Sequence, residues 1–231
     1  MQVPPDGSTV LSRRESWWAA AAATGCLVVV TLLGAGVRTD FGPQLRLDAA
    51  VSEALYAGDH RARGMDWFLE VLTAPGLTWV RALVFLPVLV LLVRRSAWWT
   101  AGWLVTAVVG IAPLTTGLKE YVGRIRPPFA DGGARYDSLS FPSGHASGIA
   151  TLVTVALVLF WPLLSAGARR WAVLVGVVLV VVVGLSRVWL GVHYLSDVVG
   201  GWSLGIAWTL ATALLFGALP GGRAALPTAA P

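Results

Sequence analysis

The chain has 231 residues, of which 56% are hydrophobic and only 13% are charged, and its mean hydropathy is +0.73. Soluble domains carry about 25% charged residues, so this composition excludes an ordinary soluble protein and indicates a membrane protein. The net charge is +5, but the basic residues are dispersed between apolar segments and form no long stripe, which argues against nucleic-acid binding.

The apolar segments are long enough to cross a bilayer. A spanning helix needs about 20 predominantly apolar residues. Six segments meet or approach this length with almost no interior charge, at residues 17–37, 77–93, 97–118, 146–164, 171–185 and 194–219. The sequence therefore predicts an all-α fold, a polytopic membrane helical bundle with six transmembrane helices.

The first apolar segment follows Arg13 and Arg14, as the apolar region of a signal peptide would. It is longer than the roughly 7 to 15 residues of such a region, so it is expected to remain as the first span. Residues 1–16 then form an N-terminal cytoplasmic segment. Cys26, the only cysteine, lies inside this span, which excludes an intrachain disulfide and a cysteine-based zinc site.

Residues 45–72 connect the first two spans and mix Leu, Val, Trp and Phe with Asp and Arg. This pattern is typical of amphipathic helices that lie at the membrane interface or pack across a bundle. We expect interfacial helices here that cover the bundle and carry no catalytic residue.

The chain ends are expected on the cytoplasmic side. Arginine pairs at positions 13/14, 94/95 and 169/170 fall at alternate ends of successive spans, as the positive-inside rule predicts for cytoplasmic segments. The opposite side carries more basic residues, several of which we interpret as parts of a site. Residues 220–231 are rich in Gly, Pro and Ala and predict a disordered tail, which leaves residues 17–219 as one six-span domain.

Polar residues gather in two connections, 119–145 and 186–197, which six spans place on the same membrane face. In the first, Lys119 closes an apolar helix and Arg126 follows seven residues later, so two cations are held near one another. Ser143 precedes the fourth span, where it can cap the helix while free backbone N–H groups face an anion.

In the second connection, Asp197 comes four residues after His193. This spacing predicts that both side chains lie on one helical face, where the carboxylate can orient the imidazole. The hydrogen bond would fix the tautomer and leave the other ring nitrogen free to act as a nucleophile.

Three ordered motifs, Lys119-x6-Arg126-Pro127, Pro142-Ser143-Gly144-His145 and Ser186-Arg187-x5-His193-x3-Asp197, together resemble the signature of the type-2 phosphatidic acid phosphatase superfamily. No position of that signature is substituted. The resemblance implies that residues 17–219 form a membrane phosphatase domain that needs neither a metal nor another cofactor.

The resemblance also implies a role for each residue. His193 would attack phosphorus and form a phosphohistidine, Asp197 would orient it, and His145 would protonate the leaving oxygen. The nonbridging phosphate oxygens would be held by Lys119, Arg126, Arg187, Ser143 and the backbone N–H of Gly144. Arg124 lies outside the signature and is expected to be a solvated loop residue, and His60 a surface residue.

Other functions are weighed against this interpretation. Vanadium haloperoxidases belong to the same superfamily, but the many spans favour a phosphatase. A transporter would place ionisable groups near the middle of its spans and show internal repeats, whereas these groups lie at span ends. A non-catalytic lipid-binding relative would not need both histidines.

The motifs leave the substrate open among phosphatidic acid, phosphatidylglycerol phosphate, isoprenyl diphosphates such as undecaprenyl diphosphate, and a small soluble phosphomonoester. A site beside the bilayer favours a membrane lipid as partner, and nucleic acid is not expected. The expected location is a prokaryotic plasma membrane, with the site on the extracytoplasmic face. The oligomeric state is not predicted.

Overall fold

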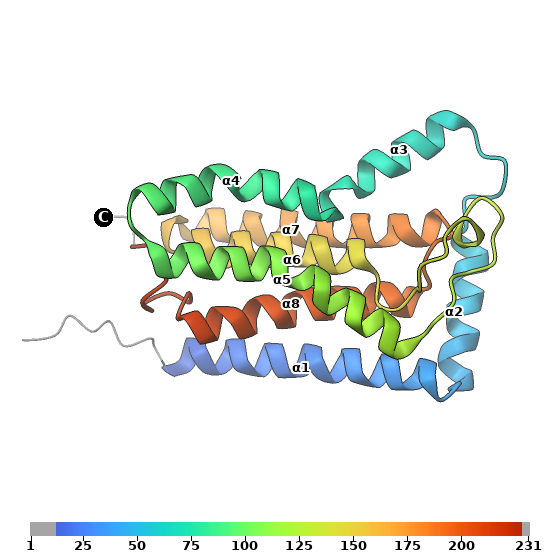
Figure 1. Ribbon diagram of the computed structural model, residues 1–231, viewed down its shortest axis with the longest axis horizontal. Helices are drawn as coiled ribbons and strands as arrows, with labels where there is room; N and C mark the ends of the chain where they lie inside the picture. Colours follow the sequence, from blue (N-terminus) through green and yellow to red (C-terminus); the bar gives the residue numbers. More distant parts are fainter. Residues whose placement is uncertain (1–12, 228–231) are drawn as a thin grey trace, which may run out of the picture.

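The computed structural model describes residues 13–227, and this part of the chain contains helices and no strand (Figure 1). The α-helices are α1 Arg13–Arg38, α2 Gly42–Leu55, α3 Arg63–Thr73, α4 Thr78–Arg94, α5 Trp98–Val122, α6 Gly144–Phe160, α7 Ala166–Trp189 and α8 Leu195–Phe216. Short 3-10 helices are η1 Ala74–Gly76, η2 Gly133–Arg135 and η3 Trp161–Leu163.

The predicted multi-pass helical bundle is confirmed, with one difference at the second span. Among the described residues, five helices are long and apolar enough to cross a membrane, namely α1, α5, α6 with η3, α7 and α8. A bent pair, in which α3 with η1 meets α4 at 49°, is the sixth candidate when its two helices are counted as one broken span. Pro75 and Gly76 lie at the break, where proline removes a backbone donor and ends regular helix.

The long helices run side by side along the length of the molecule (Figure 1). The start of α1, the α4–α5 and α6–α7 connections and the end of α8 lie at one end. At the other end, α2 crosses the bundle beside the 123–143 connection. The two predicted polar connections are therefore on the same face, and an interfacial helix covers them as expected.

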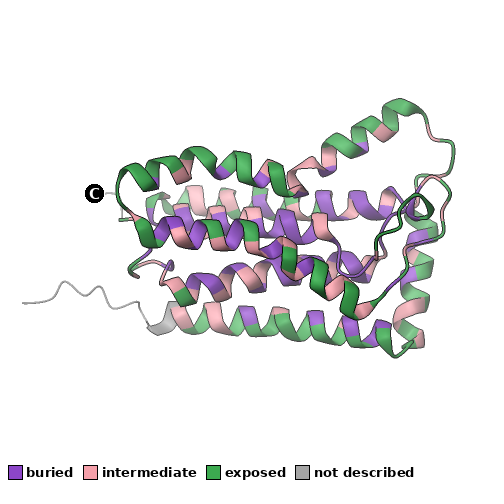
Figure 2. Ribbon diagram, in the orientation of Figure 1, coloured by how far each residue is buried: buried purple, intermediate pink, exposed green. Residues whose placement is uncertain are grey.

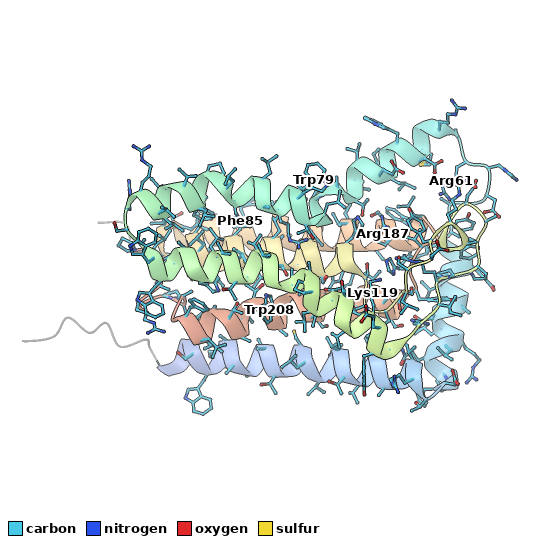
Figure 3. The ribbon with its side chains drawn as sticks, viewed as in Figure 1. Arg61, Trp79, Phe85, Lys119, Arg187 and Trp208 are labelled. Atoms are coloured by element: carbon cyan, nitrogen blue, oxygen red, sulfur yellow. The ribbon has the colours of Figure 1, made fainter. Side chains whose placement is uncertain are left out.

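The apolar side chains on the outside of the bundle suit a lipid environment. Figure 2 shows exposed residues along the outward faces and buried residues between the helices. Trp79 of α4 is 64% exposed and points outward in Figure 3, whereas Trp103 of α5 is fully buried. Lipid replaces water around such faces, so the exposure of their apolar side chains carries no hydrophobic penalty. Each helix also satisfies its own backbone hydrogen-bonding groups, as a bilayer requires.

Helices α6 and α8 approach each other through small residues. A Cβ atom added to Gly205 would lie 2.4 Å from the Ser147 carbonyl oxygen, and one added to Gly201 would lie 2.6 Å from that of Ser143. Glycines four residues apart permit this close backbone approach, as in other membrane helix pairs. The contact brings the starts of α6 and α8 together at the polar end.

Two predicted boundaries differ from the structure. Helix α7 extends to Trp189, beyond the predicted limit of residue 185, so Ser186 and Arg187 belong to its last turns. Residues 220–227 are not a disordered tail, because Ala224 is buried in the main apolar cluster and the Arg223 guanidinium lies 3.7 Å from the Trp99 ring centre. Residues 228–231, and most of the predicted segment 1–16, lie outside the described part.

The α6–α8 contact can be tested with one added methyl group. Gly205→Ala should lower the free energy of unfolding by about 1 to 3 kcal/mol, because a tightly packed interface must move apart. Gly25→Ala, on α1 where nothing lies within 4 Å of the added atom, should be neutral or stabilising by up to about 1 kcal/mol. Chemical unfolding in detergent measures both variants. Equal effects of the two substitutions would contradict the close contact.

Candidate active site

His193 and Asp197 form the centre of the polar end. His193 is 2% exposed and Asp197 is fully buried. The His193 Nδ1 lies 3.4 Å from Asp197 Oδ2 and 3.3 Å from the Ser140 hydroxyl, which donates a hydrogen bond to the same carboxylate oxygen. The carboxylate therefore orients the imidazole with its proton on Nδ1, and Nε2 keeps a lone pair.

The two residues meet for a reason different from the predicted one. His193 does not lie on a helical face, because α8 begins at Leu195, after Tyr194 as its N-cap. Asp197 is in the first turn, where its Oδ2 also accepts a hydrogen bond of 2.9 Å from the Tyr194 backbone N–H. The carboxylate thus caps its own helix and holds the preceding turn, which carries His193.

Arg126 lies on the side of the imidazole opposite Asp197. Its Nη1 is 3.1 Å from His193 Nε2 and donates a 2.7 Å hydrogen bond to the Val192 carbonyl. Burial lowers the pKa of His193 to about 3, the Asp197 carboxylate opposes this, and the charges of Arg126 and Arg187 add to it. His193 is therefore neutral at physiological pH, and its Nε2 carries no proton.

The second motif begins α6 as predicted. Ser143 is the N-cap, and its Oγ accepts a 3.4 Å hydrogen bond from the Ala146 N–H. Its backbone N–H donates a 2.9 Å hydrogen bond to the Asp197 carbonyl, which joins the second motif to the third. Gly144 and His145 line a cavity of about 240 Å³ together with Lys119. Ser143 itself is fully buried and does not line this cavity.

Lys119 and Arg187 complete the predicted set. Lys119 Nζ donates to the carbonyl groups of Leu139 and Ser140, and Arg187 Nη1 donates to the Thr73 hydroxyl at 3.3 Å. Both side chains lie toward the end of the bundle that α2 crosses (Figure 3). Within residues 13–227 neither these two nor Arg126 forms a salt bridge. Three buried or half-buried cations thus meet at one end without a carboxylate of their own, an arrangement suited to an anionic ligand.

Arg124 contradicts the prediction of a solvated loop residue. It is 8% exposed, and its guanidinium bridges Asp197 Oδ1 at 2.7 Å and Asp48 Oδ2 at 2.6 Å. Burial lowers the pKa of Arg124, but the charges of Asp197 and Asp48 outweigh it and raise the pKa overall. Arg124 is therefore a permanent cation whose charge is already neutralised, unlike that of Arg126.

Asp48 is a second residue that the sequence interpretation missed. It lies on α2 and is 2% exposed, and it also accepts hydrogen bonds from the Ser196 N–H at 2.9 Å and the Ser196 hydroxyl at 2.5 Å. Helix α2 was expected to be a cover without site residues. Gln44, Asp48 and Ser52 recur every four residues, a polar stripe that would normally indicate a solvated face. The contacts of Asp48 with Arg124 and Ser196 show that the stripe faces inward.

Comparisons with known proteins agree with this site. The family model described as the PAP2 superfamily matches residues 97–219. Phosphatidylglycerophosphatase B of Bacillus subtilis is 39% identical over 150 residues, which cover 61% of this chain and 71% of the relative. Lipid A 1-phosphatase of Rhizobium etli is 31% identical over 51% of each chain. Undecaprenyl-diphosphatase of Sulfolobus acidocaldarius is 41% identical over 66 residues, 29% of this chain and 28% of the relative.

A solved structure is similar along most of the chain. The crystal structure of the transmembrane PAP2-type phosphatidylglycerolphosphate phosphatase from Bacillus subtilis matches with a TM-score of 0.64 and 28% identity, covering 82% of this chain and 93% of that one. The fold and these relatives define an integral-membrane lipid phosphatase. The chain belongs to the PAP2 superfamily.

The Asp48–Arg124–Asp197 bridge should be a large contributor to stability. Arg124→Met should lower the free energy of unfolding by about 3 to 5 kcal/mol, because it leaves two buried carboxylates without a cation to neutralise them. The matched control is Arg135→Met, which removes the half-exposed pair of Arg135 with Asp131 and should cost at most about 1 kcal/mol. Denaturant titration in detergent measures both. A loss for Arg124→Met no larger than that for the control would show that the bridge contributes little.

Proposed function

We propose that this phosphatase acts through a phosphohistidine intermediate on a lipid phosphate or diphosphate. The observation that supports this most directly is the environment of His193. Its neutral ring is held at Nδ1 by Asp197, and Nε2 faces Arg126 at 3.1 Å. A phosphoryl group that binds Arg126 would displace that contact and bring phosphorus next to the Nε2 lone pair.

In the first half-reaction the Nε2 lone pair of His193 forms a bond to phosphorus, and the P–O bond to the lipid breaks. The electron pair stays on the departing oxygen, which takes a proton from protonated His145. Lys119, Arg126 and Arg187 would bind the nonbridging oxygens, joined by the Gly144 N–H at the start of α6, while Ser143 holds that helix terminus in place. Preorganised cations and N–H groups of this kind stabilise the charge of the transition state, the part a metal ion plays in other phosphatases.

In the second half-reaction a water molecule loses a proton to His145 as its oxygen bonds to phosphorus. The P–N bond breaks, and the electron pair returns to His193. The enzyme is restored with His145 protonated, and the products are the dephosphorylated lipid and inorganic phosphate. One histidine thus serves as acid and then as base, as microscopic reversibility requires.

A lipid is the proposed substrate because the site opens at the end of a membrane bundle whose outer faces are apolar. The relatives include enzymes named for phosphatidylglycerol phosphate, lipid A and undecaprenyl diphosphate. Each of those names describes an amphiphile that carries its phosphate at the membrane surface. We favour an isoprenyl diphosphate or a glycerophospholipid phosphate over a soluble phosphomonoester.

The mechanism can be tested by phosphate release in detergent with EDTA, from phosphatidic acid, phosphatidylglycerol phosphate and undecaprenyl diphosphate, with a soluble sugar phosphate for comparison. His193→Ala should abolish release and the trapping of covalent phosphate, because it removes the nucleophile. His60→Asn is the control, since His60 is exposed and outside the site, and it should leave release unchanged. Turnover by His193→Ala would exclude the phosphohistidine, and release from the sugar phosphate alone would exclude a lipid substrate.

The role of His145 can be separated from that of His193 by the leaving group. His145→Ala should slow release from a lipid alkoxide by about 10²- to 10⁴-fold, the usual contribution of general acid catalysis. With p-nitrophenyl phosphate, whose leaving group needs no proton, the loss should be far smaller. Steady-state rates on both substrates provide the measurement. An equal loss on the two would rule out His145 as the leaving-group acid.

We further propose that the protein lies in the plasma membrane with its termini in the cytoplasm and its site outside. Single cysteines at Ala134 and Ala166 report on opposite ends of the bundle, since both positions are exposed, Ala134 lies in the 123–143 connection and Ala166 begins α7. In a Cys26→Ser background an impermeant thiol reagent should label Ala134→Cys in intact cells and Ala166→Cys only after lysis. The reverse pattern would invert the proposed orientation.

A further inference from the structure

The cavity beside His145 has a second wall that the mechanism does not use. Lys119, Gly144 and His145 line one part of it, and Arg81 lines another with Thr78 and other residues of α4, α5 and α6. Arg81 belongs to the first turns of α4, next to the break in the second span. It lies outside all three motifs.

Arg81 is a buried cation without a counterion. It is 2% exposed, and within the described residues it forms no salt bridge. Its Nη1 donates a 2.7 Å hydrogen bond to the Gly76 carbonyl, and its Nη2 donates one of 3.3 Å to the Thr78 hydroxyl. Its Nε is buried with no partner. A guanidinium has five N–H donors, so most of its hydrogen-bonding capacity is unused.

Two glycines hold Arg81 against the helix that carries His145. A Cβ atom on Gly148 of α6 would lie 2.2 Å from Arg81 Nη1, and one on Gly76 would lie 2.6 Å from the His145 carbonyl oxygen. The break between α3 and α4 therefore packs directly on the first turns of α6. This packing places the guanidinium on the same cavity as the proposed leaving-group acid, His145.

The free-energy cost of burying the Arg81 guanidinium without a counterion indicates that an anionic ligand binds beside it. An unpaired cation within a membrane span is expensive, and such residues usually face a functional cavity and pair with an anion there. The proposed reaction releases a lipid group on the side of His145, so the anion beside Arg81 would be part of that leaving group. Phosphatidic acid offers no such anion. Lipid diphosphates, and phosphatidylglycerol phosphate with its internal phosphodiester, carry a second phosphate there.

We propose that Arg81 binds a second phosphate that stays on the leaving group, and that it selects lipids carrying two phosphates over lipids carrying one. This inference rests on the proposed function, because it takes the direction of the leaving group from the role of His145. The phosphate that is transferred stays with Lys119, Arg126 and Arg187. Arg81 thus acts on substrate choice and not on the attack by His193.

The test compares substrates that share a tail. Farnesyl diphosphate and farnesyl monophosphate differ only by the second phosphate, and phosphatidylglycerol phosphate differs from phosphatidic acid by a glycerol and a second phosphate. Arg81→Gln should lower kcat/KM by about 10- to 100-fold for a lipid with two phosphates, the usual effect of losing a hydrogen bond to a charged group. For the lipid with one phosphate the change should stay within about threefold. Arg81→Lys keeps the charge, so it should retain part of the preference for the lipid with two phosphates that Arg81→Gln loses.

The control is Arg94→Gln, the same change at the exposed far end of α4. It should leave kcat/KM unchanged for both pairs of lipids. A loss confined to the farnesyl pair supports a phosphate linked directly to the transferred one, and a loss confined to the glycerophospholipid pair supports one linked through glycerol. An equal loss on all four lipids would overturn the proposal and leave Arg81 as a residue that only holds the α3–α4 break.

A binding measurement separates this proposal from the mechanism. The measurement uses a His193→Ala background, because binding can then be followed without turnover. In it, farnesyl diphosphate should raise the Tm more than farnesyl monophosphate does. Adding Arg81→Gln should remove that difference. If His193→Ala still releases phosphate, the proposed mechanism fails. If the Tm difference persists with Arg81→Gln, the role of Arg81 fails whatever the mechanism.

Discussion

Buried positive charge that has no carboxylate of its own organises the polar end of this bundle. Lys119, Arg126 and Arg187 converge there without a salt bridge among the described residues, and each is held by carbonyl or hydroxyl oxygens. Carbonyl oxygens orient a cation without cancelling its charge. Burial of unpaired cations costs free energy that a bound anion would offset, so the arrangement is preorganised for an anionic group such as the phosphate proposed here.

Arg124 lies two residues before Arg126 and is also an arginine, but its charge has the opposite role. Its charge is cancelled by Asp48 and Asp197, so it serves as a structural link and leaves little attraction for a ligand. The link joins the interfacial helix α2 to the carboxylate that orients His193. Helix α2, which lies across the bundle, thereby becomes part of the support of the proposed nucleophile, and its position is tied to that of Asp197.

The apolar packing explains how residues far apart in sequence meet with this precision. Gly201 and Gly205 let α6 and α8 approach until the Ser143 N–H bonds to the Asp197 carbonyl. The start of α6 then faces the turn that carries His193. A lipid-facing bundle gains little from hydrophobic burial between its helices, so close contact of small residues is the interaction that fixes this geometry.

The sequence by itself determined the class of fold, the shared face of the two polar connections and the family to which the three motifs point. Apolar span length and motif spacing are local properties, readable from residue type and position. It ended α7 before Arg187. It also misassigned Arg124 and treated α2 as a cover without site residues, because a polar residue outside a span looks the same whether it meets water or a buried charge. Its placement of His193 and Asp197 on one helical face was wrong for a related reason, since a helix can begin between two residues at helical spacing. The burial of Asp48, the break between α3 and α4, and the unpaired Arg81 beside His145 are decided by which segments pack together, and only the tertiary structure brings those segments into contact.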